Sequence, residues 1–190
     1  MKGDFSRDTF DSVKHFSRVL QQQGRVQLDA DWNEQSDIET HRDETTTKDV
    51  VGKCGGPLDG AGFLITPNPS GTNLKIGKGR YYVDGILCEN ESDLLYTAQP
   101  DFPASLPPAE GNGLYLAYLD VWQRHLTFLD DIAIREVALG GPDTATREKT
   151  LWQVKLKRVG GGVPNIDCVH AENLDTFKGL SLSLGKLFAR

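Results

Sequence analysis

Hydrophobic and polar residues alternate in the segment 25–32. The apolar residues occupy every second position: Val26, Leu28, Ala30 and Trp32. A period of two is typical of a strand that buries one face, so we predict a short strand here. The pattern changes at Asp31, because Asp31 and Glu34 have the spacing of a capping box at the start of a helix. We therefore predict a strand that runs directly into a helix.

The predicted helix runs from about Asp31 to Val51, is stopped by Gly52, and is very polar. Its apolar residues are few: Trp32, Ile38, Val50 and Val51. An isolated polar helix of this length is only marginally stable in water, since most helices in proteins are held by packing of an apolar face. Two interpretations stay open: the helix lies on the surface of its own domain, or a partner chain holds it.

Apolar residues before this segment recur mostly at intervals of three to five: Phe5, Phe10, Val13, Phe16, Val19 and Leu20. In one interpretation, Asp11 or Ser12 caps a helix that runs to about Gln23 and ends at Gly24. In the other, the segment is an extended arm whose aromatic side chains dock into a neighbour. The pattern does not distinguish the two.

A tight hairpin is predicted at Asp84-Gly85. These residues separate two apolar runs, Gly79–Val83 and Ile86–Glu89. Asp-Gly between two such runs favours a type I′ turn, because that turn needs positive φ at both central positions.

Further strands are predicted at Phe63–Thr66, Leu74–Ile76, Leu114–Trp122 and Leu151–Val159. The first two flank a turn-rich connection and predict a hairpin with a long tip. Leu114–Trp122 is apolar on both faces until Asp120, which is typical of a central strand covered on both sides. Leu151–Val159 alternates and is expected to cover the core on one side only.

These elements predict an α+β fold, a mainly antiparallel β-sheet domain preceded by an N-terminal arm and a polar helix. We expect three parts. Residues 1–60 hold the arm and helix as an assembly element, residues 61–160 form the antiparallel β domain, and residues 161–190 form a C-terminal extension. In the extension, Leu180, Leu182 and Leu184 alternate with small residues in a short strand.

Composition excludes little by itself. The chain has 190 residues and a formal net charge of −6, which gives no electrostatic reason to bind nucleic acid or an anionic membrane. No apolar run approaches the ~18 residues of a membrane span, and the first residues lack the apolar core of a signal peptide. We therefore expect no membrane span and synthesis in the cytoplasm.

Three cysteines are present: Cys54, Cys88 and Cys168. Their number is odd and no pair has C-x-x-C spacing, so neither a disulfide framework nor a zinc site is supported. Buried thiols are the simpler interpretation.

Two groups of residues could hold a metal ion. Asp29, Asp31 and Asn33 match the first ligand positions of an EF-hand loop, but Glu34 replaces the required glycine and Thr40 replaces the closing glutamate. Helix capping explains them better. The second group is Glu34, Asp37, His41 and Glu44, which lie at helical spacing. A solvated polar face of the helix explains these residues without a metal.

No catalytic arrangement assembles from the sequence. A G-x-S-x-G elbow is absent, Gly52–Gly56 lacks the phosphate-loop spacing, and Asp130-Asp131 is more simply a charged turn than a glycosidase pair. We predict a protein that is not an enzyme, with no catalytic residue, metal or cofactor. Two alternatives are a carboxylate-dependent glycan hydrolase and a carbohydrate-binding β module. The latter would expose aromatic residues on one open face: Tyr81, Tyr82, Trp122 and Trp152.

Four motifs carry a family resemblance: Gly3–Phe10, Gln22–Gln35, Gly79–Gly85 and Gly141–Arg147. Together they resemble an uncharacterised bacterial and phage domain family. That family is associated with the N-terminal part of tail-fibre-like and baseplate-associated proteins of contractile phage tails and extracellular contractile injection systems. The resemblance covers residues 1 to about 160 and supplies no catalytic residues.

The resemblance implies a structural adaptor of a phage-tail-like contractile particle, which binds other subunits and ends up in a virion or injection system. We expect a homo-oligomer, a trimer if the analogy with fibres holds. The arm and helix, Phe5–Val51, are the predicted contact element, with charge pairs between Arg42 and the acidic residues of a neighbour. The predicted interaction residues are Phe5, Phe10, Phe16, Trp32, Arg42, Asp43 and Glu44.

Overall fold

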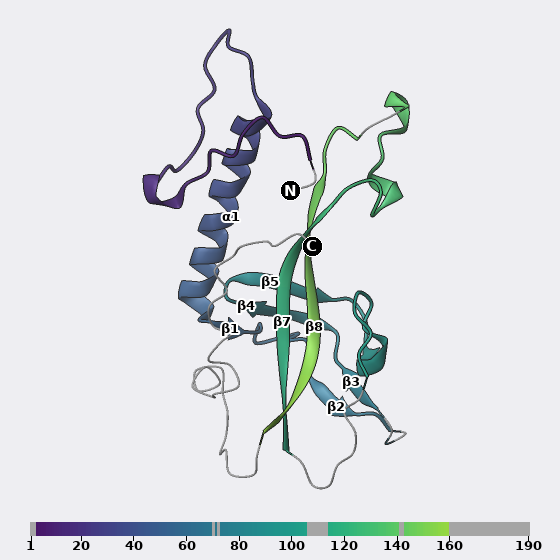
Figure 1. Cartoon of the computed structure of the whole chain (residues 1–190). Helices are drawn as coiled ribbons and strands as arrows, with labels where there is room; N and C mark the ends of the chain where they lie inside the picture. The colour runs from purple at the N-terminus through teal and green to yellow at the C-terminus, as the bar shows by residue number, and fades with distance from the viewer. Residues whose placement is uncertain (1–2, 70, 72, 106–113, 141–142, 160–190) are drawn as a thin grey trace. The chain divides into compact units, whose positions relative to one another are not determined.

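The computed structural model describes residues 3–69, 71, 73–105, 114–140 and 143–159, and within them the fold is α+β, as predicted (Figure 1). One α-helix near the N-terminus is followed by strands in antiparallel sheets. The predicted strand at Leu180–Leu184 lies outside the described residues. Within the described part of the chain, no helix combines the length and the apolar character that crossing a membrane requires.

Contacts divide the chain into two compact units, each built from several segments. The helical unit contains residues 1–52, 84–86 and 125–149. The sheet unit contains residues 53–83, 87–124 and 150–190. The predicted division into residues 1–60, 61–160 and 161–190 stays a prediction.

Helix α1 extends from Asp29 to Val51. Its first turn is acidic, which suits the positive end of the helix dipole, and Asp31 Oδ2 accepts a hydrogen bond from the Leu28 amide at 3.4 Å. Its C-terminus is the predicted one: Gly52 has a φ of 90° and its amide donates to the Lys48 carbonyl at 2.8 Å.

The predicted strand over residues 25–32 is wrong. Residues 25–28 have no regular structure, and α1 begins at Asp29, two residues before the predicted cap. The alternation contained only four apolar residues, and two aspartates in the first turn stabilise a helix instead. Ala30 and Trp32 then lie on different sides of the helix, the first buried and the second exposed.

The N-terminal segment is an arm with little regular structure and not the long helix, while the docking of its aromatic side chains into a neighbour stays a prediction. Asp11 does act as a cap, since its carboxylate accepts from the Val13 amide at 3.0 Å. It caps only the short 3₁₀ helix η1, Ser12–Lys14, which ends at His15 with a left-handed φ of 55°. A backbone in this conformation cannot continue a helix, so the predicted helix to Gln23 is wrong.

The strands of the described residues form three antiparallel sheets. The first has the order β1-β4-β5, the second β2-β3-β6, and the third pairs β7 with β8. The strands are β1 Cys54–Gly55, β2 Ile65–Pro67, β3 Leu74–Ile76, β4 Gly79–Val83, β5 Ile86–Asn90, β6 Leu94–Leu95, β7 Leu114–Leu126 and β8 Arg147–Val159. The 3₁₀ helices η2 Tyr96–Ala98, η3 Ile132–Ile134 and η4 Val137–Leu139 complete the elements.

Both predicted hairpins are confirmed. Ile65 pairs with Ile76 across β2 and β3. Asp84 and Gly85 connect β4 to β5 with φ values of 54° and 94°, as a type I′ turn requires.

The prediction that Leu114–Trp122 is a central strand is wrong for the described residues. Strand β7 continues to Leu126 and pairs with β8 in a two-stranded sheet. Its apolar side chains pack on residues of the sheet unit. Leu119 packs against the core, and Trp122 lies edge-on to Phe102, which belongs to a loop, with ring centroids 5.0 Å apart.

The core lies in the sheet unit and centres on Ile76, Tyr96 and Val154. The partly buried residues that pack on it are Phe63, Ile65, Leu74, Leu94, Ala104, Leu119, Trp152 and Leu156. Burial also raises the pKa of the Cys88 thiol to about 12, so the predicted buried thiol is confirmed there. At Cys54 it is wrong, because that residue is disulfide-bonded. Cys168 lies outside the described residues.

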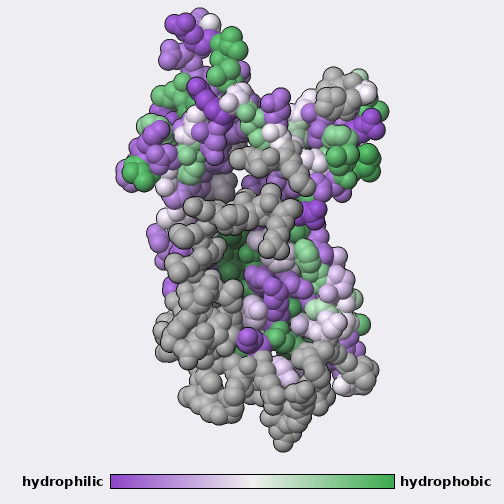
Figure 2. Space-filling model, in the orientation of Figure 1, coloured by the Kyte–Doolittle hydropathy of each residue, from purple (hydrophilic) through white to green (hydrophobic). Residues whose placement is uncertain are grey.

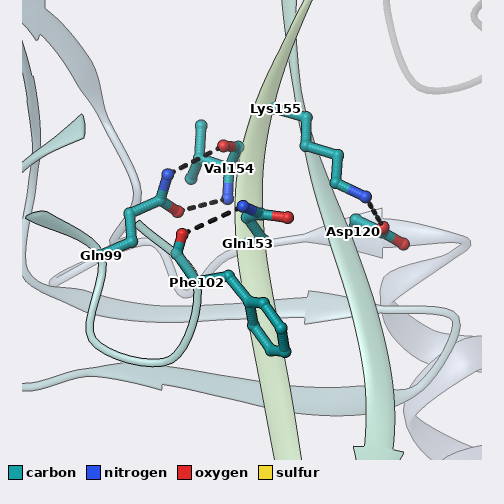
Figure 3. Close-up of polar contacts among 6 residues, drawn as sticks. All are labelled: Gln99, Phe102, Asp120, Gln153, Val154 and Lys155. Atoms are coloured by element: carbon teal, nitrogen blue, oxygen red, sulfur yellow. Dashed lines mark hydrogen bonds and ion pairs between the residues drawn. The ribbon is translucent and has the colours of Figure 1, made fainter. Parts of the chain in front are cut away.

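A buried amide side chain ties the segment after η2 to β8 (Figure 3). Gln99 Oε1 accepts from the Val154 amide at 2.7 Å, and Gln99 Nε2 donates to the carbonyls of Val154 and Tyr96, both at 3.0 Å. Gln153 Nε2 donates to the Phe102 carbonyl at 3.0 Å. The amide of Gln99 is thus fully satisfied although its side chain is buried.

Candidate interaction surface

The N-terminal arm is hydrogen-bonded to its own helix. The Ser6 amide donates to Asp29 Oδ2 at 2.8 Å, and the Ser6 hydroxyl donates to Asp29 Oδ1. Thr9 Oγ1 donates to Glu34 Oε2 at 2.6 Å. The side-chain and backbone hydrogen bonds of Ser6 lower the pKa of Asp29, because they stabilise the carboxylate.

Two further contacts hold the later part of the arm. The Val19 amide donates to Gln35 Oε1 at 2.7 Å, and the Phe10 ring packs on His41 with centroids 5.7 Å apart. The hydrogen bonds between the arm and α1 join exposed or partly buried groups, for which water competes. The contact is therefore specific but weakly held.

The C-terminal half of α1 packs against the hairpin tip at Asp84-Gly85. An added Cβ on Gly85 would lie 2.3 Å from the carbonyl oxygen of Glu44. Lys48 forms a 2.5 Å ion pair with Asp84, with both side chains about half exposed. Burial first, and then the charge of Glu148, raises the pKa of Glu44. Glu44 is therefore partly buried, and its backbone faces the hairpin tip.

The outer face of α1 carries six exposed residues at helical spacing: Trp32, Ser36, Glu39, Asp43, Thr46 and Val50. Steps of four and three residues place them on a single stripe, which we call the outer stripe. Trp32 is 62% exposed and Val50 is 80% exposed. The outer stripe is thus apolar at both ends and acidic in the middle, while the only buried residues of α1 are Ala30 and Ile38.

A second exposed surface precedes the helix at residues 12–28, which we call the basic segment. It contains three basic residues and no acidic one: Lys14, Arg18 and Arg25. Four of its apolar side chains are more than half exposed, namely Val13 at 77%, Phe16 at 56%, Leu20 at 70% and Val26 at 83%. Figure 2 shows such apolar surface mixed with hydrophilic surface over the N-terminal segment. Exposed apolar groups of this kind often mark protein interaction sites.

The predicted interaction residues divide into two groups. Exposed positions on the surface are Phe16, Trp32, Arg42 and Asp43. Arg42 and Asp43 lie on the exposed surface of α1 with Glu39 and Thr46. The other three lie against parts of their own chain. The Phe5 ring lies edge-on to the His125 ring, with centroids 6.1 Å apart. The surroundings of Phe10 and Glu44 are those described above.

Sequence reasoning missed several exposed apolar residues of the helical unit: Leu20, Val26, Leu129, Ile132 and Val137. The signal for the first two was present, because residues 12–28 combine apolar and basic residues without an acidic one. The last three gave no such signal, since their spacing is irregular.

The aromatic residues of the carbohydrate-binding alternative are partly buried in the sheet unit: Tyr81, Tyr82, Trp122 and Trp152. Trp152 meets Phe63 edge-on at 4.8 Å, and its Nε1 donates to the Glu89 carbonyl at 2.8 Å. These rings therefore take part in packing, and the two tryptophans have aromatic neighbours inside the unit.

Carboxylates at the metal-ligand positions suggested by the sequence accept hydrogen bonds within the chain. Asp29 accepts from Ser6, Asp31 from the Leu28 amide and Glu34 from Thr9. Burial, then Asp8 and Glu34, raises the pKa of Asp37. Among the residues that the structure describes, no group of three or more His, Cys, Asp or Glu side chains could hold a metal ion.

Comparison with known proteins gives one match. A family model described as a family of unknown function, DUF6519, matches residues 1–171. No curated protein and no solved structure matches the chain.

Proposed function

The chain belongs to the DUF6519 family, and from this premise we propose that it is a structural subunit of a phage-tail-like contractile particle, which acts through protein–protein contacts. The resemblance of the four sequence motifs supports the particle, and the exposed surface of the helical unit supports the mode of action. In this proposal the chain is made in the cytoplasm, is not an enzyme, and forms a homo-oligomer within the particle, a trimer if the fibre analogy holds.

The observation that carries the proposal is how little of the arm and helix is buried. Helix α1 has 23 residues, of which only Ala30 and Ile38 are buried. Full burial of a large apolar side chain contributes roughly 1.5–3 kcal/mol. Because Trp32 and Phe16 are 62% and 56% exposed, most of the stabilisation that their burial could provide is not gained within the chain. Burial of this surface by other subunits would stabilise both the helix and the assembly.

The test is incorporation into assembled particles. We expect the double variant Phe16→Glu, Trp32→Glu to fold normally, because both side chains are exposed, yet to be absent from purified sheath-and-tube particles. The matched control is Leu58→Glu, Leu64→Glu, which changes two exposed leucines of the sheet unit, 101% and 67% exposed, by the same charge. It should be incorporated like the unaltered chain.

Two results would count against the proposal. Normal incorporation of the double variant would exclude Phe16 and Trp32 as contact residues. Absence of the unaltered chain from purified particles would exclude the particle itself. A glycan array and a hydrolysis screen on the same preparations test the carbohydrate-binding and hydrolase alternatives, both of which should be negative.

A further inference from the structure

The charge of the helical unit is strongly segregated along the chain. Helix α1 contains eight acidic residues and two basic ones, a net charge of −6 with histidine neutral. The basic segment, residues 12–28, carries three basic residues and no acidic one, a net charge of +3. Two α1 helices placed side by side would repel each other, whereas the basic segment is complementary to α1.

The apolar residues of the two surfaces are also complementary in arrangement. The outer stripe has Trp32 and Val50 at its ends and Glu39 and Asp43 between them. The 18 residue steps from Trp32 to Val50 correspond to roughly 27 Å of helix. The basic segment can span this length, because an extended chain covers about 3.3 Å per residue.

The basic segment does not cover the outer stripe of its own chain. The arm donates hydrogen bonds to Asp29, Glu34 and Gln35, and the stripe residues remain exposed. Phe16 and Leu20, at 56% and 70%, are also exposed. Both complementary surfaces of one copy are therefore open at the same time.

We propose that the basic segment of one copy lies along the outer stripe of α1 of a second copy. The inference rests on the proposed function, that the arm and helix make the contacts with other subunits, and it names the partner and the two surfaces. Since the surfaces differ, the interface is heterologous. Repetition of this contact closes a ring or extends a fibre, and a reciprocal exchange between two copies closes a two-fold dimer.

The experiment uses the full chain and two charge-reversed variants. The first, Arg18→Glu, Arg25→Glu, alters the basic segment, and the second, Glu39→Lys, Asp43→Lys, alters the outer stripe. All four side chains are exposed. At about 0.1 M salt we expect each variant alone to self-associate at least about tenfold more weakly than the unaltered chain in sedimentation velocity, because like charges then face each other.

Mixing the two variants is the decisive step. In the mixture each altered surface meets a surface of opposite charge, so association should return to within about threefold of the unaltered chain. Controls with the same charge changes elsewhere are Arg135→Glu, Lys157→Glu and Asp59→Lys, Glu91→Lys, at exposed positions. They should associate normally. Raising the salt to about 0.5 M should weaken association of the unaltered chain.

Three outcomes would overturn the inference and leave the proposed function to the particle test. In the first, the full chain stays monomeric at every salt concentration. In the second, it associates and the mixture of variants does not recover. In the third, the basic segment binds vesicles of phosphatidylserine without any self-association, which would make its partner an anionic lipid surface.

Discussion

Gly85, at the tip of the β4–β5 hairpin, is a position where one added methyl group should strongly destabilise the fold. It has a φ of 94°, is buried, and faces the helix backbone. In Gly85→Ala the new Cβ would lie 2.3 Å from the Glu44 carbonyl oxygen and 2.9 Å from its carbonyl carbon, while real Cβ contacts are essentially never below 3.0 Å. Backbone atoms cannot rotate away, so either the tip or the helix must move.

The expected loss of stability has two parts. A positive φ in a residue other than glycine costs about 1–2 kcal/mol, and overpacking of a well-packed site costs about 1–3 kcal/mol more. The sum, roughly 2–5 kcal/mol, is a large fraction of the ~5–15 kcal/mol that stabilises a typical domain. Gly24→Ala isolates the first part, because Gly24 has a φ of 70° and nothing within 4 Å of its Cβ position.

Urea denaturation followed by circular dichroism measures the total effect, and hydrogen exchange of α1 amides measures the local one. We expect a lower transition midpoint and faster exchange near Glu44 in Gly85→Ala, with a shift at most half as large in Gly24→Ala. If the two variants lose the same stability, the contact between the hairpin tip and α1 contributes nothing and the reasoning is refuted.

Gln99→Leu should destabilise the sheet unit by about 2–4 kcal/mol, because the amide and carbonyl of Val154 lose their partner, and thermal denaturation should show it. Cys88 should resist alkylation in the folded protein, since a pKa of about 12 leaves roughly one thiol in ten thousand ionised at pH 8; mass spectrometry should find rapid labelling only in denaturant. The lowered pKa of Asp29 means that its bonds to Ser6 stabilise the arm at neutral pH, and this contribution is lost as the pH falls through the lowered pKa. Limited proteolysis of the arm against pH should report that loss, and Asp29→Asn should flatten the profile.

The elements that could be predicted from the sequence are those with a local physical cause. Asp84-Gly85 determines a type I′ turn by itself, and Gly52 ends a helix because it reaches positive φ without strain. The prediction of a strand over residues 25–32 was wrong, because the alternation of apolar and polar residues competes with two aspartates that stabilise a helix N-terminus. No local sequence pattern predicts that His15 adopts a left-handed conformation and ends a helix after one turn.

The candidate surface was predicted in part for the same reason. A polar helix with one tryptophan near its start indicated exposed apolar surface, and Trp32 and Phe16 are exposed. Phe10 and Glu44 could not be separated from them, because their contacts with His41 and the hairpin tip join residues far apart in the sequence. Only tertiary packing decides which aromatic ring stays available for a partner.

The side chain of Gln99 has a consequence for how this chain avoids unwanted association. Towards Val154 its amide presents a donor and an acceptor, as a peptide group does, and it occupies the backbone positions of Val154 that a further strand would use. Exposed strand edges recruit other edges, which leads to aggregation. By placing a glutamine at this point of β8, the fold blocks strand addition there with a single residue. Such a block matters most where copies of a chain are held at high local concentration.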